Sequence, residues 1–193
     1  MWPILLLGFL CMYMSHAIIG TPQRILSCNI RGLPFVNGWG YHGRLGAFIN
    51  EQKSFYDTIV LQEVFMPGVR NTVRAALEPE FNTIYRSNLF AGNGLMIASR
   101  YDIGQVETTT FESCSGTDCL TEKGAMGARI GDLFLVVTHL QDAAWDESGR
   151  VRRDQLENIK RLCANRNSSI LVVGDFNTPP ASPLLRSLGM EVV

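Results

Sequence analysis

Val-Val-Gly-Asp-Phe-Asn, at residues 172–177, is an apolar run that ends in a carboxylate and a carboxamide two positions apart. Alternate side chains of a β-strand lie on the same face. We therefore expect Asp175 and Asn177 to point together into a cleft that could hold a phosphate or a water molecule. The alternative is that Gly-Asp-Phe-Asn only forms a turn, but turns rarely need so apolar a lead-in.

Three other apolar runs also end in polar residues that suit a metal and phosphate site. They occupy residues 25–29, 59–63 and 135–139, and their last residues are Asn29, Glu63 and His139. Four such endings in one chain indicate a shared site at the polar ends of several strands.

The remaining pattern predicts an α/β sandwich. Apolar, β-branched runs predict strands at residues 24–30, 58–62, 94–99, 127–130, 132–138 and 169–174. Helices are predicted at residues 44–52, 68–77 and 150–164, the last with charged side chains on its outer face. The Gly131-Asp132 connection predicts a hairpin, so part of the sheet is antiparallel. The fully apolar strands are typical of central strands covered by helices on one side and a second sheet on the other.

Composition and charge are those of one globular domain. The chain has 193 residues, of which 46% are hydrophobic and 18% charged, and its formal net charge is −1. This balance gives no overall attraction for nucleic acid or for an anionic membrane. The densest local basic group is Arg150, Arg152 and Arg153.

The N-terminus has the pattern of a secretory leader. Residues 1–17 carry no acidic or basic side chain, are apolar from residue 4 to residue 14, and end in Ser-His-Ala. We therefore expect a signal peptide at residues 1–17 and an exported domain at residues 18–193. An uncleaved membrane anchor is the alternative, although the apolar run is short for a span of about 20 residues.

Four cysteines remain after such a cleavage. An even number in an oxidising compartment permits disulfides, and the four-residue spacer between Cys114 and Cys119 is long enough to close a local loop, so this pair is predicted. Cys28 and Cys163 lie on a predicted strand and a predicted helix, where buried thiols fit at least as well as a bridge.

Glu63 ends a strand where a carboxylate is costly unless a positive group accompanies it. Mg²⁺ prefers oxygen ligands and keeps several waters, so Glu63 and the side-chain oxygen of Asn29 would make a sparse metal site. The alternative is that Glu63 pairs with a lysine or caps a helix that begins at Pro67.

The other polar ends suit a phosphate. The imidazole of His139 could bind a non-bridging phosphate oxygen, Asn177 could donate to the phosphate, and Asp175 could orient or deprotonate an attacking water. A lone histidine at this position could instead be a structural residue with satisfied hydrogen bonds.

Five motifs, taken in order, resemble the endonuclease/exonuclease/phosphatase superfamily, also called DNase I-like. They are residues 26–34, 60–65, 92–100, 138–141 and 174–177. The resemblance spans residues 24–190 and implies a four-layered sandwich of two mixed sheets flanked by helices. It also implies that Asn29 and Glu63 hold Mg²⁺, that His139 and Asn177 contact phosphate, and that Asp175 positions water.

Within that superfamily the chain is most similar to neutral sphingomyelinases of the sphingomyelinase C type. The segments that carry this closer resemblance are residues 62–65, 138–141 and 118–124. The resemblance implies that Lys123 approaches the substrate, and the alternative is that Lys123 is a solvated loop lysine. The implied protein is a secreted, monomeric Mg²⁺-dependent phosphodiesterase that hydrolyses sphingomyelin at a membrane surface to ceramide and phosphocholine.

The chain departs from that pattern at its C-terminus. Members of the superfamily continue to a Ser-Asp-His motif whose histidine is the general base, whereas this sequence ends at Val193. We therefore expect a C-terminally truncated sandwich with impaired catalysis, since loss of a general base lowers rates by about 10²–10⁴. The rival hypotheses are a nuclease of the same fold, which the near-neutral charge disfavours, and an inactive secreted binding module.

Overall fold

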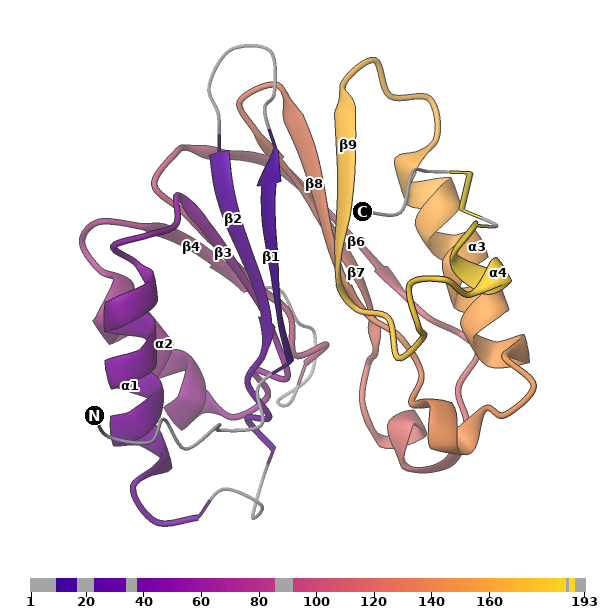
Figure 1. The fold of residues 1–193 in the computed structure, drawn as a ribbon, viewed down its shortest axis with the longest axis horizontal. Helices are drawn as coiled ribbons and strands as arrows, with labels where there is room; N and C mark the ends of the chain where they lie inside the picture. Colours follow the sequence, from indigo (N-terminus) through magenta and orange to yellow (C-terminus); the bar gives the residue numbers. More distant parts are fainter. Residues whose placement is uncertain (1–9, 17–22, 34–37, 86–91, 187, 190–193) are drawn as a thin grey trace.

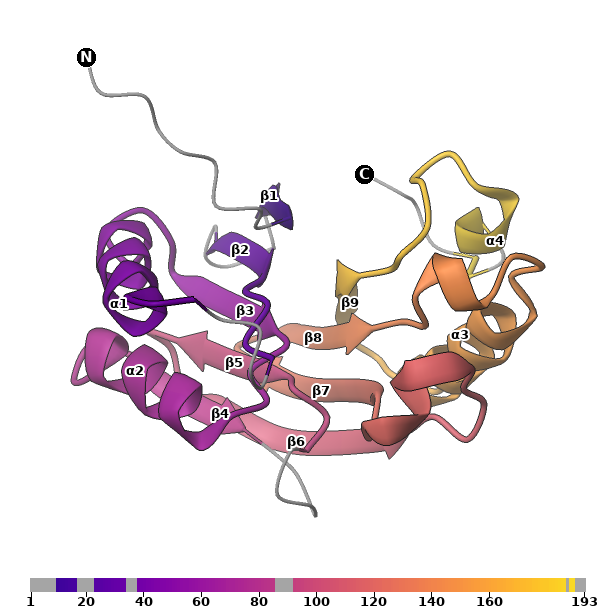
Figure 2. The same cartoon turned by 90° about the horizontal axis from the view of Figure 1, so that it is seen from below.

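The computed structural model describes residues 10–16, 23–33, 38–85, 92–186 and 188–189, which build four layers (Figures 1 and 2). Helices α1 (Tyr41–Gln52) and α2 (Pro67–Leu77) cover the outer face of one sheet. Helix α3 (Arg150–Cys163) covers the outer face of the other sheet. The predicted sandwich of two mixed sheets flanked by helices is confirmed.

The first sheet has five strands in the order β1-β2-β3-β5-β4. Their bounds are β1 Leu10–His16, β2 Gln23–Asn29, β3 Thr58–Gln62, β4 Asn82–Tyr85 and β5 Met96–Ser99. Strands β2 and β3 are parallel, and the other neighbours in this sheet are antiparallel. The sheet is therefore mixed, with one parallel pair near its centre.

The second sheet has four strands in the order β6-β7-β8-β9. Their bounds are β6 Ile103–Thr110, β7 Gly124–Ile130, β8 Leu133–His139 and β9 Ser169–Asp175. The predicted hairpin joins β7 to β8, which are antiparallel, and β8 and β9 are parallel. The described residues also form three short helices: η1 (Gly116–Leu120), η2 (Ala143–Trp145) and α4 (Pro183–Arg186).

Alternation along the strands divides the apolar residues between separate cores. In β8, Leu135 and Val137 face the first sheet, whereas Phe134 and Val136 face α3. A strand buried on both faces reads as a continuous apolar run. Because β8 is buried on both faces, its sequence is a continuous apolar run from which the strand could be predicted.

The sequence missed strands β4 and β6, which lie at the edges of the two sheets. Strand β6 is mostly exposed or half-buried and rich in threonine, so it lacks an apolar run. Edge strands need less hydrophobic surface and often carry polar residues. Periodicity therefore finds central strands more readily than edge strands.

Strand β1 lies within the predicted leader and pairs with β2 in antiparallel register. Residues 1–9 and 17 lie outside the described residues, and cleavage of a leader stays a prediction. In the described parts of the chain, no helix has both the length and the apolar character that crossing a membrane requires.

The two parallel pairs bring the polar strand ends together. Because parallel strands end at the same edge of a sheet, Asn29 lies beside the end of β3, and His139 lies opposite Asp175. Strand β9 packs against β2 and β3 of the facing sheet, so the two edges meet at one end of the sandwich.

Gly174 permits the closest approach of β9 to β8 at this end. Its φ is 144°, and a Cβ atom there would lie 2.0 Å from the carbonyl oxygen of Thr138. Only glycine adopts this backbone conformation readily and leaves room for the neighbouring main chain. Gly174 therefore sets the position of Asp175 beside His139.

We expect Gly174→Ala to lower the free energy of unfolding by about 3 kcal/mol, because backbone strain adds to a main-chain clash. Urea denaturation measures the change. The control is Gly43→Ala, at an exposed position of helix α1 where a Cβ atom meets nothing within 4 Å; it should stabilise by about 0.5–1 kcal/mol. Equal stability of the Gly174 variant and wild type would contradict this account of β9.

Candidate functional site

One amide group joins the polar ends of the two sheets. The Nδ2 atom of Asn29 donates to Glu63 Oε1 at 2.8 Å and to Asp175 Oδ2 at 2.9 Å. Asn29 ends β2 and Glu63 directly follows β3 of the first sheet, and Asp175 ends β9 of the second. Residues predicted separately at three strand ends therefore form one cluster.

Glu63 has a buried carboxylate oxygen without a partner. Its Oε1 accepts from Asn29, but Oε2 is buried and has no hydrogen bond. Burial raises the pKa of Glu63, while the Asn29 hydrogen bond and the charge of Lys123 act against this rise. Neither alternative expected from the sequence is seen, because Glu63 forms no ion pair with a described lysine and α2 has no side-chain cap.

His139 also has an unpartnered buried atom. The Nζ atom of Lys123 lies 3.3 Å from His139 Nε2. An ammonium group can only donate, so Nε2 accepts and the proton of the neutral ring is on Nδ1. That Nδ1 is buried and has no hydrogen-bond partner. His139 is therefore not the satisfied structural residue of the alternative reading.

Burial, and after it the nearby charge of Lys123, lower the pKa of His139 to about 4, although Asp175 acts to raise it. The ring is thus neutral near pH 7. The separation of 3.8 Å between His139 Nε2 and Asp175 Oδ2 is then a contact with a neutral ring and not an ion pair.

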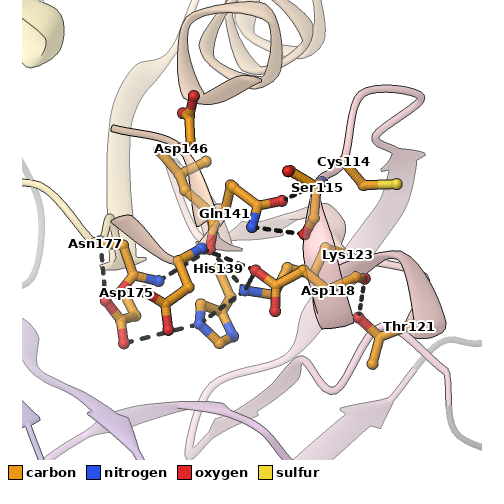
Figure 3. A network of polar contacts seen from close by, with 12 residues as sticks. Cys114, Ser115, Asp118, Thr121, Lys123, His139, Gln141, Asp146, Asp175 and Asn177 are labelled. Atoms are coloured by element: carbon orange, nitrogen blue, oxygen red, sulfur yellow. Dashed lines mark hydrogen bonds and ion pairs between the residues drawn. The ribbon is translucent and has the colours of Figure 1, made fainter. Parts of the chain in front are cut away.

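Lys123 is buried and fully hydrogen-bonded. Besides His139, its Nζ donates to Asp118 Oδ2 at 2.7 Å and to the carbonyl oxygen of Leu140 at 2.8 Å (Figure 3). Only 6% of its surface is exposed, so it is not a solvated loop lysine. Its direct contact with a substrate stays a prediction, and such a contact would replace one of these three partners.

Asp175 and Asn177 come together through a turn and not through strand alternation. Strand β9 ends at Asp175, and Asn177 has a left-handed φ of 47°. The backbone N–H of Asn177 donates to Asp175 Oδ1 at 3.0 Å, while its side-chain Nδ2 donates to the Leu140 carbonyl at 3.0 Å. The predicted pair is adjacent, but the geometric reason given for it was wrong.

Left-handed backbone is concentrated at this site. Four non-glycine residues among those described have positive φ, and three of them are Arg31 (51°), Glu63 (61°) and Asn177. Each such residue costs on the order of 1–3 kcal/mol and persists only where its surroundings enforce it. The clustering fits a functional site, where backbone strain is commonly stored.

The donor set suits a hard cation in a sparse site. Glu63 offers the free Oε2, and the Asn29 oxygen accepts from the Arg31 N–H at 3.0 Å, which leaves it a second lone pair. Among the described residues, no group of three or more His, Cys, Asp or Glu side chains could hold a metal. One carboxylate with an amide oxygen and waters fits Mg²⁺ better than Zn²⁺.

The predicted pair Cys114 and Cys119 is disulfide-bonded and closes a loop against the site. Asp118 within this loop accepts from Lys123 and from the backbone N–H of Asp142 at 2.8 Å. Gln141 fastens the same loop through the backbone N–H and carbonyl of Ser115 (Figure 3). Cys163 is a buried free thiol.

Sequence reasoning missed Asp118, Gln141 and Arg152 as supporting residues. The sequence shows Arg152 only as a member of its densest local basic group, whereas in the structure just 8% of its surface is exposed. The signal was present, because Arg152 precedes Leu156, Ile159 and Cys163 at spacings of four, three and four, which places it on the buried face of α3.

A model of the Endonuclease/Exonuclease/phosphatase family matches residues 26–191. No curated protein sequence matches the chain. Among solved structures, a beta toxin mutant from Staphylococcus aureus with bound magnesium ions has a TM-score of 0.76 and 18% identity, over 87% of this chain and 69% of that one. Sphingomyelinase C from Streptomyces griseocarneus has a TM-score of 0.69 and 20% identity, over 83% and 66%. Humanized TDP2 from D. rerio has a TM-score of 0.65 and 15% identity, over 86% and 65%.

We expect His139 to make folding stability depend on pH. Its folded pKa of about 4 lies below the ordinary 6.5, so its contribution is complete above pH 6.5 and is lost as the pH falls toward 4. Glu63, with a raised pKa, acts in the opposite direction. Urea denaturation in EDTA between pH 6.5 and 4 should therefore show that the free energy of unfolding falls less steeply with pH for His139→Gln than for wild type. Parallel curves for the two proteins would argue against a buried neutral ring.

Proposed function

The chain belongs to the endonuclease/exonuclease/phosphatase family, and from this premise we propose that it is a Mg²⁺-dependent phosphodiester hydrolase. We further propose that its substrate is sphingomyelin or a closely similar choline phospholipid, cleaved to ceramide and phosphocholine. The residues proposed to act are Asn29, Glu63, His139, Asp175 and Asn177. Lys123 supports them through its contact with His139.

One observation supports this proposal most directly. In the described part of the chain, two buried side-chain atoms lack a hydrogen bond, and they are Glu63 Oε2 and His139 Nδ1. The first is an acceptor suited to a cation, and the second is a donor suited to an anion. Asp175 connects them, since it shares the Asn29 amide with Glu63 and contacts His139. A phosphate with its metal ion would satisfy both atoms.

Each residue then has a role in hydrolysis. Mg²⁺ held by Glu63 and Asn29 would neutralise phosphate charge and stabilise the leaving oxygen. Asp175 would orient the attacking water and accept its proton. The Nδ1–H group of His139 would donate to a non-bridging oxygen as charge develops there.

Asn177 would supply a second donor. Its Nδ2 carries two hydrogens, and one is used by the Leu140 carbonyl. Lys123 would hold His139 in the tautomer that donates from Nδ1, because its ammonium donates to Nε2.

His42 is not placed to accept a proton from the attacking water, because it lies on helix α1 in the outer helical layer and is hydrogen-bonded to Thr72. Proton acceptance is therefore assigned to Asp175.

Exposed apolar side chains around the site support a lipid substrate. Leu120 (83% exposed) lies on η1, which contains the Lys123 partner Asp118, and Trp145 (53% exposed) lies on η2, whose N-cap residue Asp142 donates through its backbone N–H to Asp118. Trp145 packs on η1, because its ring fills the space beside Gly116. Apolar side chains of this kind can enter the interfacial region of a bilayer.

Trp39, which precedes helix α1, is fully exposed. It is two residues from Tyr41, whose hydroxyl donates to the carbonyl of Ile30, next to Asn29. By contrast, exposed Phe55 lies near Arg24, at the opposite end of β2. The apolar side chains thus favour one end of the sandwich. Export of the protein is also proposed, and the disulfide is compatible with it.

Mg²⁺ should stabilise the folded protein through Glu63. Wild type should gain about 2.7 kcal/mol at a Mg²⁺ concentration 100-fold above the dissociation constant, and Glu63→Gln should lose this gain. Thermal denaturation with and without Mg²⁺ measures it. Glu51→Gln, on the exposed face of α1, is the matched control. If Glu63→Gln responds to Mg²⁺ like wild type, Glu63 is not the ligand.

The same variants test the reaction. Purified protein should release phosphocholine from sphingomyelin only with Mg²⁺, and Glu63→Gln should lower the rate at least about 100-fold, as expected when a few kcal/mol of transition-state stabilisation is lost. Absence of phosphocholine from wild type with bound Mg²⁺ would favour the binding module. Cleavage of DNA, with an affinity that falls steeply with salt, would identify a nuclease instead.

The lipid assignment predicts a difference between the two ends of the sandwich. Leu120→Ala and Trp145→Ala should each weaken binding to sphingomyelin-containing vesicles about tenfold, since full burial of such a side chain contributes about 1.5–3 kcal/mol. Phe55→Ala is the control and should bind like wild type in a vesicle co-sedimentation assay. Hydrolysis of soluble bis(p-nitrophenyl) phosphate should be equal in all four proteins. An equal loss of vesicle binding in the Phe55 variant would remove the support for a lipid surface.

A further inference from the structure

Helix α3 places a charged side chain on its buried face. Arg152 and Gln155 lie on the side that carries Leu156, which packs against the second sheet. Gln155 accepts from the backbone N–H of Gln141 at 2.8 Å and donates to the Ser113 carbonyl at 2.9 Å. The N-terminal half of α3 thus contacts loops beside the site through polar groups. Arg152 has no part in the chemistry proposed above.

Asp146 fixes the orientation of Arg152. Its carboxylate accepts from the Arg152 Nε at 3.3 Å and from the backbone N–H groups of Val151 and Arg152 at 3.2 and 3.0 Å. Arg152 Nη2 also donates to the Asp146 carbonyl at 2.8 Å. Asp146 and Arg152 are 5% and 8% exposed. A buried pair with this many hydrogen bonds leaves the guanidinium a single orientation.

The remaining nitrogen of that guanidinium faces the turn after β9. Nη1 donates to the carbonyl of Asn177 and lies 3.4 Å from Thr178 Oγ1. Asn177 is held here in its left-handed conformation, and its side chain and N–H reach Leu140 and Asp175. The backbone of Asn177 is therefore fixed from one side by Arg152 and from the other by Asp175.

We propose that Arg152, oriented by Asp146, is a positioning residue that sets the placement of Asn177 and Asp175 for phosphodiester hydrolysis. Its catalytic consequence rests on the proposed function, whereas its structural consequence does not. Arg152 touches neither the substrate nor the metal ligands in this scheme. Its effect passes through the carbonyl of Asn177.

Arg152→Lys is the decisive variant, because it keeps the charge but has no planar fork that reaches Asp146 and Asn177 together. The side-chain amide signal of Asn177 in a ¹H–¹⁵N spectrum, identified by its loss in Asn177→Asp, should move or broaden. With Mg²⁺ and bis(p-nitrophenyl) phosphate, kcat should fall about tenfold to 100-fold, the range for a misplacement of about 1 Å, with KM within about twofold.

Two further variants keep the test decisive. Arg153→Lys, at the adjacent exposed position, should leave the amide signal and kcat unchanged. Asp146→Asn, which is isosteric, should act like Arg152→Lys but more weakly, and it replaces Arg152→Lys if that protein does not fold. A folded Arg152→Lys protein with the wild-type Asn177 signal and wild-type kcat overturns the proposal. Wild type without turnover would contradict the proposed function, while the amide signal would still decide the positioning role.

Discussion

The hydrogen bonds of the Asn29 amide are the contact on which the rest of the site depends. Its Nδ2 donates to a carboxylate of each sheet, Glu63 on one side and Asp175 on the other. Two carboxylates this close would repel each other at a buried rim, and a shared donor reduces that repulsion. The same amide links the end of β2 to the end of β9. The site therefore requires that the two sheets pack against each other.

Most polar atoms of the site are already engaged with protein groups. Lys123 has three partners for its three protons, and Asn177 uses its backbone N–H and one side-chain hydrogen. Groups fixed in this way need little reorganisation when charge develops on a substrate. Among the described residues, the buried side-chain atoms left without any partner are Glu63 Oε2, an acceptor, and His139 Nδ1, a donor. The arrangement therefore leaves hydrogen-bonding capacity where a cation and an anion could meet.

Strand periodicity predicted the central strands and the polar residues at their ends, because a strand such as β8, buried on both faces, leaves a continuous apolar run. It failed where the chain leaves regular structure. The turn at Asn177 depends on a left-handed residue and an Asp175 hydrogen bond, which no period of two describes. Burial of Lys123 depends on its contacts with His139 and with the carbonyl of Leu140, which lie 16 and 17 residues further along the chain. Such contacts are tertiary, so sequence spacing cannot supply them.

Arg152 shows how helix α3 differs from a simple cover for the sheet. Its apolar residues fill the outer core, but its N-terminal half contributes a buried guanidinium and the Gln155 amide. Burial of such groups is weakly stabilising at best and costly when a partner is missing. The left-handed Glu63 and Asn177 and the unpartnered Nδ1 atom of His139 add to that cost at the same end of the molecule. Unfavourable features gathered in one place are expected where function constrains a fold. The three apolar cores of the sandwich offset this cost.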